Sequence, residues 1–249
     1  MPRFRLTAVL FALALPLSAA AEALTVSAAA SLTNVFKELG QRFEQSHPGT
    51  MVRFNFAASG VLLQQMAQGA PVDVLASADQ ATMDRAAAQK LVDTSTRRDF
   101  AANSLVVIAP LQGGPAVASL PDLARSEVKR IAIGKPATVP VGNYTRQALE
   151  SAGLWSPLQS RLVQADSVRQ VLDYVARGEA DAGFVYRTDA AIMRDKVKIV
   201  LTASGHDPVS YPVAAAAGSR HRALADRFIA FLLSAPGQEA LARYGFGKP

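Results

Sequence analysis

Short apolar runs alternate along the chain with segments whose apolar residues have helical spacing. The runs that predict β-strands cover residues 24–29, 51–56, 72–77, 105–109, 130–133, 162–164, 182–186, 197–201 and 213–217. Apolar residues at every third or fourth position predict helices over 32–45, 61–67, 79–88, 144–152, 167–177 and 222–233. This alternation predicts an α/β protein with largely parallel sheets.

Two serines each stand where a predicted strand runs into a helix. Ser31 follows the strand 24–29, and Ser59 follows the strand 51–56. A serine at such a junction is commonly an N-cap, because its oxygen accepts from an unpaired backbone N–H. The same place has free N–H groups and the positive end of the helix dipole, so it also suits an anion. Two junctions of this kind favour a cleft that holds an oxyanion.

Three further segments lie at the carboxyl ends of predicted strands, where ligands bind in open α/β sheets. The segment 135–144 opens a helix and offers the first-turn N–H groups of Val141 and Gly142 as donors. The segment 165–168 brings Val168 to the start of another helix. Tyr186 ends the strand 182–186 with a phenol, which is either a neutral donor or a packing residue at an interface.

The first 21 residues predict an export signal. Two arginines, an apolar stretch over 6–17 and the small residues Ala19–Ala21 follow one another, so the mature chain is expected to begin near Glu22. The apolar stretch is too short to span a bilayer. The sequence has no cysteine, which excludes disulfides and a lipid-modified cysteine after the signal. The remaining length of about 228 residues is enough for one large domain or two small ones.

The charge distribution and the polar residues argue against several other functions. The net charge is +6, and the basic residues are spread along the chain without an aromatic-interleaved stripe, so we expect no nucleic-acid binding. His47, His206 and His221 lack metal-ligand spacing and are interpreted as solvated surface residues. The charged segment 93–99 is interpreted as a solvated turn. Ser31 lacks the Gly-x-Ser-x-Gly elbow of a hydrolase, and we expect no enzyme.

Seven short segments form one set, in order along the mature chain. They are 28–34 (AAASLTN), 56–59 (FAAS), 69–79 (GAPVDVLASAD), 103–110 (NSLVVIAP), 139–144 (VPVGNY), 183–186 (GFVY) and 236–246 (PGQEALARYGF). With this set the chain resembles the periplasmic molybdate-binding proteins of ABC transporters. Each piece alone is weak, but the set is specific.

The resemblance implies a two-lobed periplasmic binding protein of type II, with its ligand in the cleft between the lobes. Each lobe is expected to be a mostly parallel sheet flanked by helices. Residues 1–21 would be the signal peptide, residues 24–102 and 211–249 would form lobe 1, and residues 103–210 would form lobe 2. The resemblance also implies a monomer in the periplasm that delivers its ligand to an inner-membrane ABC permease.

In this family neutral donors hold the oxyanion. Carried over to this sequence, the donors are the hydroxyl and N–H of Ser31, the hydroxyl and N–H of Ser59, the N–H of Val141, the N–H of Val168 and the hydroxyl of Tyr186. The implied site needs no cofactor and reaches molybdenum only through its oxygens.

Three positions depart from common versions of the family. Val141 often appears as alanine, which a backbone donor tolerates. Ser167 stands where asparagine or aspartate is common, and Gly60 replaces what is often a second serine.

A site made only of donors selects a fully deprotonated anion. Molybdate and tungstate offer only acceptors, whereas protonated phosphate would also need an acceptor from the protein. Sulfate has the same charge and shape but is smaller, so cavity size would have to exclude it. Three alternatives stay open at this point: a sulfate-binding protein, an exported hydrolase that uses Ser31 or Ser59, and a ligand-sensing domain on the same fold.

Overall fold

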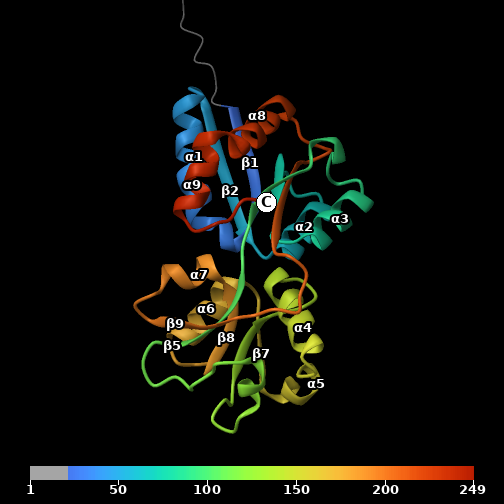
Figure 1. Ribbon diagram of the computed structural model, residues 1–249. Coiled ribbons are helices and arrows are strands. Elements are labelled where there is room, and N and C mark those ends of the chain that lie inside the picture. Colours follow the sequence, from blue (N-terminus) through green and yellow to red (C-terminus); the bar gives the residue numbers. More distant parts are fainter. Residues whose placement is uncertain (1–21) are drawn as a thin grey trace, which may run out of the picture.

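The computed structural model describes residues 22–249, so the predicted export signal at 1–21 lies outside the described residues. Two five-stranded sheets, each covered by helices, form two lobes that lie one above the other in Figure 1. The expected two-lobed α/β architecture is confirmed.

The first sheet has the strand order β2-β1-β3-β10-β4. Its strands are β1 (Glu22–Ala29), β2 (Thr50–Ala57), β3 (Val74–Ala76), β4 (Arg98–Ala102) and β10 (Ser210–Ala215). Its helices are α1 (Thr33–Ser46), α2 (Ser59–Ala67), α3 (Gln80–Ala88), α8 (Arg222–Leu233) and α9 (Ala235–Arg243), with the short 3-10 turns η1 (Ala30–Leu32) and η2 (Thr94–Thr96).

Two helical layers cover this sheet because its strands have apolar residues on both faces. In β3, Val74 and Ala76 belong to the core beneath α1 and α8, whereas Leu75 packs with Leu62 and Met83 of α2 and α3. Figure 1 shows α1, α8 and α9 on one side of the sheet, and α2 and α3 on the other.

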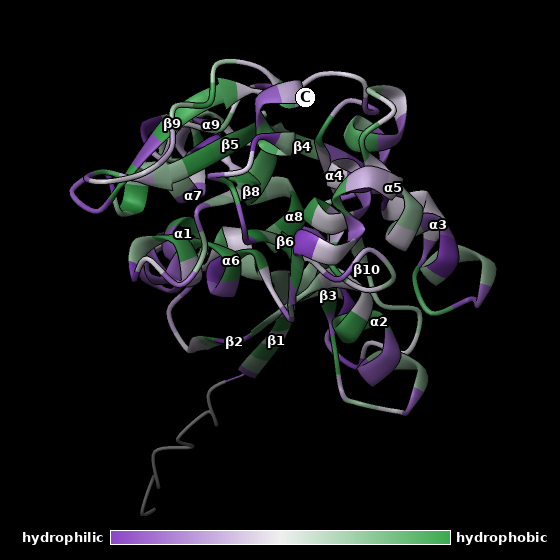
Figure 2. Ribbon diagram, turned by 90° about the horizontal axis from the view of Figure 1, so that it is seen from below, coloured by the Kyte–Doolittle hydropathy of each residue, from purple (hydrophilic) through white to green (hydrophobic). Residues whose placement is uncertain are grey.

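The second sheet has the strand order β7-β6-β8-β5-β9. Its strands are β5 (Leu105–Pro110), β6 (Ile131–Gly134), β7 (Leu162–Ala165), β8 (Ala182–Tyr186) and β9 (Val197–Thr202). Its helices are α4 (Pro140–Ser151), α5 (Trp155–Leu158), α6 (Val168–Ala176) and α7 (Arg187–Ile192), with the 3-10 turns η3 (Leu120–Ala124) and η4 (Gln159–Arg161). Figure 2 shows the strands of the molecule mostly in green, among helices and loops with purple outer segments.

Both sheets are more mixed in strand direction than the expected pattern. Three strands in each are parallel, β2-β1-β3 and β7-β6-β8, but β10 and β5 run antiparallel to their neighbours. These two strands adjoin the connections between the sheets. The chain passes from β4 to β5 and later from β9 to β10, so it crosses between the lobes twice (Figure 1).

The structure also contains elements that the sequence pattern did not predict. The segment 93–99 is not simply a solvated turn, because Arg98 and Asp99 begin the edge strand β4. The strand continues into the buried Phe100 and Ala101. Its first two residues are charged, so the search for apolar runs did not predict a strand here. Helix α9 begins after Ser234, whose hydroxyl accepts from the Gly237 N–H.

Candidate anion site

The five residues predicted to bind the ligand surround one cavity between the lobes. Its lining consists of small, apolar and hydroxyl-bearing residues: Ala29, Ala30, Ser31, Ala58, Ser59, Ala78, Val139, Pro140, Val141, Val168 and Tyr186. None of these side chains carries a charge. The cavity is small, with room for about one water molecule as the lobes are placed, so no sugar or peptide fits in it.

Four helical N-termini converge on this cavity. Ser31 lies in η1 directly after β1, and Ser59 is the first residue of α2 after β2. From the second lobe, Val141 is the second residue of α4 after β6, and Val168 is the first residue of α6 after β7. First-turn N–H groups have no intrahelical partner and carry the positive end of the dipole. The arrangement therefore offers positive potential from both lobes without a charged side chain.

The backbone donors at these positions are not used by turns or caps. Among the backbone bonds outside helices and strands in residues 22–249, none has the N–H of Ser31, Ser59, Val141 or Val168 as its donor. The prediction that Gly142 also offers a free N–H is wrong, because that group donates to the Val139 carbonyl at 2.9 Å.

The hydroxyls of the two serines each already accept a hydrogen bond from the protein. Ser59 Oγ accepts from the Ala78 N–H at 3.0 Å, and Ser31 Oγ accepts from the Tyr211 hydroxyl at 3.2 Å. Both serines are almost fully buried. Because a hydroxyl has one hydrogen to donate, each serine is left with its O–H for a group in the cavity.

Tyr186 supplies a third hydroxyl from the end of β8. Its side chain is 1% exposed, and its oxygen has no hydrogen-bond partner among the described residues. Burial raises the pKa of the Tyr186 phenol well above its usual value, so the group stays protonated and neutral. A buried hydroxyl without a partner costs free energy, and an anion in the cavity would remove that cost.

Ser167, which stands where asparagine or aspartate is common in the family, directly precedes α6. Its hydroxyl caps α6 by accepting from the Gln170 N–H at 3.2 Å. Ser167 therefore stabilises the helix start that presents the Val168 N–H, and its side chain is not among those that line the cavity.

The lobes are closed around the cavity by direct contacts. The Gly60 N–H of α2 donates to the Thr138 carbonyl of the other lobe at 3.0 Å. A Cβ at position 60 would lie 2.7 Å from that carbonyl oxygen, so the close approach requires glycine. This contact explains why a serine would not fit at position 60 in this closed arrangement.

A second interlobe contact comes from Arg169, which follows Val168 in α6. Arg169 donates from Nη2 to the Ser31 carbonyl at 3.2 Å and from Nη1 to Asn34 Oδ1 at 3.0 Å. Its Nε lies 2.8 Å from Oδ1 of Asp189, whose side chain is fully buried. The sequence analysis missed Arg169, Asp189 and Tyr211, because no local pattern indicates which residues meet across the lobes.

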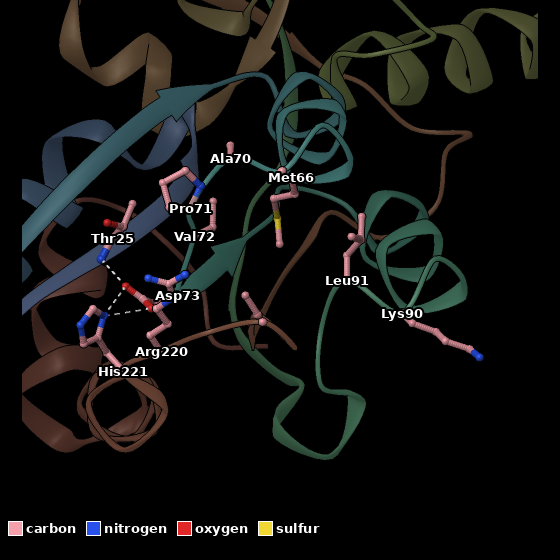
Figure 3. A pocket seen from close by; sticks show the side chains of 13 residues that line it. Thr25, Met66, Ala70, Pro71, Val72, Asp73, Lys90, Leu91, Arg220 and His221 are labelled. Carbon is pink, nitrogen blue, oxygen red and sulfur yellow. Dashed lines mark hydrogen bonds and ion pairs between the residues drawn. The ribbon is translucent and has the colours of Figure 1, made fainter.

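A larger cavity of about 700 Å³ lies elsewhere, at the amino ends of β1 and β3 (Figure 3). The carboxylate of Asp73 there accepts from the Thr25 N–H at 2.8 Å and the Ser219 hydroxyl at 2.7 Å, and it lies 3.3 Å from His221 Nδ1. His221 is therefore paired and is not merely a solvated residue. These polar groups satisfy one another, so they do not form a second anion site.

Two negative findings apply to the described part of the chain. Within residues 22–249, no group of three or more histidine or acidic side chains is arranged to hold a metal ion. No helix in the same range combines the length and apolar character needed to cross a bilayer.

The fold and the cavity together define a class: two-lobed proteins that enclose a small solute between their lobes. The family model described as "Bacterial extracellular solute-binding protein" matches residues 24–247, and the chain belongs to this family. Members of this class bind and deliver solutes for transport. The family resemblance expected from the sequence is confirmed.

Individual relatives agree with this assignment. Molybdate-binding protein ModA of Escherichia coli (strain K12) is 38% identical over 229 residues, which cover 90% of this chain and 88% of that protein. The solved periplasmic molybdate-binding protein of Azotobacter vinelandii is 25% identical with a TM-score of 0.78, over 91% of this chain and 99% of that one.

The fold is also shared with a protein named for another oxyanion. The sulfate-binding protein SubI of Mycobacterium tuberculosis H37Rv has a TM-score of 0.81 at 18% identity, over 90% of this chain and 86% of that one. This likeness shows a common fold alone, so the choice of ligand must be argued from the site.

Proposed function

We propose that this protein is an exported solute-binding protein that captures molybdate, and tungstate equally, and delivers it to an inner-membrane ABC permease. The proposal is supported by the interlobe cavity, which is lined by Ser31, Ser59, Val141, Val168 and Tyr186 and by no charged side chain. The ligand would be held by Ser31, Ser59, Val141, Val168 and Tyr186.

The energetics are sufficient for tight binding. A hydrogen bond to a charged group contributes roughly 1.5–3 kcal/mol. Several such bonds would outweigh the cost of association and closure and leave a binding free energy of about −8 kcal/mol or better, which corresponds to micromolar affinity or tighter. Neutral donors also avoid the desolvation cost of burying a cationic side chain.

The proposal extends to the organisation of the chain. Lobe 1 would comprise residues 24–102 and 211–249, and lobe 2 residues 103–210, with the two crossings between them as the hinge. The protein would act as a periplasmic monomer without a cofactor and without catalysing a reaction. The donor set is made for holding an anion, and the histidine that a serine hydrolase would need is not among the residues that line the cavity.

Sulfate is the second candidate, because it accepts the same hydrogen bonds. The two anions differ in size, so the spacing of the donors in the closed state has to discriminate between them. Molybdate is favoured by the 38% identity to the Escherichia coli molybdate-binding protein, whereas the sulfate-binding structure is only 18% identical.

A melting experiment with four anions tests the proposed function. A ligand at a hundredfold excess over its Kd stabilises the folded state by about 2.7 kcal/mol, which raises the Tm by several degrees. We expect similar shifts with molybdate and tungstate and far smaller ones with sulfate or phosphate. A sulfate shift equal to the molybdate shift would reassign the ligand, and no shift with any anion would overturn the proposal.

Calorimetric titration of variants then tests the residues. Ser31→Ala and Ser59→Ala should each weaken molybdate binding by about 1.5–3 kcal/mol, the value of a lost bond to a charged group. Val141→Ala is the control, since it keeps the backbone N–H. Unchanged affinity in both serine variants would remove the serines from the site.

A further inference from the structure

One guanidinium joins two helix starts that lie in opposite lobes. Arg169 directly follows Val168 at the start of α6, in the second lobe. Its Nη2 donates to the Ser31 carbonyl at 3.2 Å and its Nη1 to Asn34 Oδ1 at 3.0 Å, both in the first lobe. Figure 1 shows α6 in the lower lobe, on the same side of the molecule as α1. Because donor and acceptors belong to different lobes, these two bonds exist only while the lobes are closed.

The third nitrogen of the guanidinium is held by a residue of the second lobe itself. Arg169 Nε lies 2.8 Å from Oδ1 of Asp189 in α7, whose side chain is fully buried. Both members of this ion pair belong to the second lobe, so opening of the cleft does not separate them. Fixing a long side chain in one rotamer costs conformational entropy, and here the ion pair fixes it before the lobes close. The guanidinium is therefore preorganised to bind the first lobe.

The surroundings of Arg169 argue against a role as a charge that attracts the anion. Its side chain is not among those that line the cavity, and the Asp189 carboxylate balances its charge. Steering of an anion depends on positive charge that is not compensated nearby. The bonds of Arg169 to the first lobe go to protein groups, so they stabilise closure rather than contact with the ligand.

We infer that Arg169 is a latch between the lobes, which lengthens the time that a bound anion stays in the site without choosing between anions. The inference rests on the proposed function. The latch bonds form after the anion has entered and the lobes have closed, and they must break before the anion leaves. Since they join protein to protein, they should stabilise the closed complex of every anion by the same factor. Arg169 is a positioning residue, because it acts through closure.

Asn34→Ala tests one latch bond and leaves the buried ion pair of the second lobe intact. Asn34 is exposed in the first turn of α1. Release of radiolabelled molybdate into excess unlabelled molybdate gives the dissociation rate, and stopped-flow protein fluorescence gives the association rate. We expect the dissociation rate to rise about 3–10-fold, the effect of one lost hydrogen bond, and the association rate to change by less than about twofold.

Arg169→Lys tests the whole latch while it keeps a positive charge beside Asp189. A lysine ammonium is a compact charge without the planar fork, so it should not serve Asp189 and the first lobe together. We expect a dissociation rate about tenfold higher or more, and the Kd values of molybdate and sulfate raised by the same factor. Gln41→Ala, at an exposed position further along α1, is the control and should leave both rates unchanged.

Three results would overturn the inference. An unchanged dissociation rate in Asn34→Ala and Arg169→Lys would show that these contacts do not hold the lobes together. A slower association with unchanged dissociation would show that Arg169 attracts the anion instead. A loss of affinity for one anion only would show that it acts on the ligand and not on closure. If Arg169→Lys folds poorly, the dissociation rate of Asn34→Ala decides.

A failure of the proposed function would be distinguishable from a failure of the latch. If the wild type binds neither molybdate nor sulfate, the proposed function is overturned, and the latch is judged on the ligand-free protein. The sequence has no cysteine, so Gln41→Cys provides a single site for a nitroxide label. Paramagnetic relaxation enhancements of the α6 amides then report the population of closed molecules. These enhancements should be smaller when Asn34→Ala is added, and equal enhancements would overturn the latch.

Discussion

Asp189 and Arg169 form an ion pair whose carboxylate is completely buried. Burial raises the pKa of Asp189 to about 6, and Arg169 opposes the shift only in part. The same arginine reaches the Ser31 carbonyl and Asn34 in the other lobe. One side chain thus compensates a buried charge in lobe 2 and binds the backbone beside the candidate site in lobe 1.

The raised pKa of Asp189 predicts a pH dependence of stability. The folded state holds the proton of Asp189 more tightly than the unfolded chain does. The protonated carboxyl therefore stabilises the fold at low pH, and this stabilisation is lost as the pH rises from about 4 through about 6. The difference of about two units corresponds to about 3 kcal/mol. Asp189→Asn should lack this loss. The free energy of unfolding of the variant should therefore rise relative to that of the wild type as the pH increases from about 4 to about 6.

Urea denaturation at several pH values between about 4 and 7 measures this difference. Asp195→Asn, at an exposed position between α7 and β9, is the control for the loss of one carboxylate. A constant difference between wild type and Asp189→Asn would contradict the expected titration.

At the scale of elements, the start of α2 has two roles that compete. Its Ser59 faces the cavity, while the next residue, Gly60, approaches the Thr138 backbone of the other lobe. Glycine inside a helix usually costs stability relative to alanine. Here the missing Cβ permits closure of the two lobes, and glycine leaves α2 less stable than alanine at position 60 would.

Gly60→Ala should therefore affect stability and binding in opposite directions. The ligand-free protein should be equally stable or more stable by up to about 1 kcal/mol, because helix propensity improves. Molybdate binding should weaken by about tenfold, roughly 1.4 kcal/mol, because the new Cβ meets the Thr138 backbone on closure. Thermal melts and calorimetric titration measure the two effects.

Gly218→Ala is the matched control, since a Cβ there meets no atom within 4 Å. It should leave molybdate binding unchanged. Wild-type affinity in Gly60→Ala would mean that the loop at Thr138 moves aside without cost, and that the contact does not control closure.

At the scale of the whole molecule, ligand contacts would come from both lobes. Ser31 and Ser59 project from the first sheet, and Val141, Val168 and Tyr186 from elements of the second. A ligand that binds such a divided site favours the closed arrangement over any open one. The two connections near Asn103 and Tyr211 are the places where the lobes would turn.

Small-angle X-ray scattering should detect this closure. We expect the radius of gyration of the ligand-free protein to fall when molybdate is added to saturation, because the lobes close on the anion. Ser59→Ala at a molybdate concentration that saturates only the wild type should remain in the extended form. An unchanged radius of gyration in the wild type would show that binding does not require closure.

The sequence by itself determined the class of fold and the positions of the helix starts that present the donors. Hydrophobic spacing predicted most strands and helices, because core burial imposes the periods of two and 3.6 residues. The strand-to-helix junctions at Ser31, Ser59, Val141 and Val168 could be read locally, since first-turn N–H groups are free wherever a helix begins. The motifs around them also indicated the family.

Only the tertiary structure decided how those junctions work together. Tyr211, which donates to the hydroxyl of Ser31, is 180 residues away from it along the chain. Asn103, which donates to the hydroxyl of Tyr211, is 108 residues away from Tyr211. Gly60 needs no side chain for a reason that lies in the other lobe, at Thr138. Contacts of this kind depend on how two sheets are packed against each other, and a local pattern carries no information about that packing. The junctions were therefore predictable one by one, whereas the polarity and closure of the site were not.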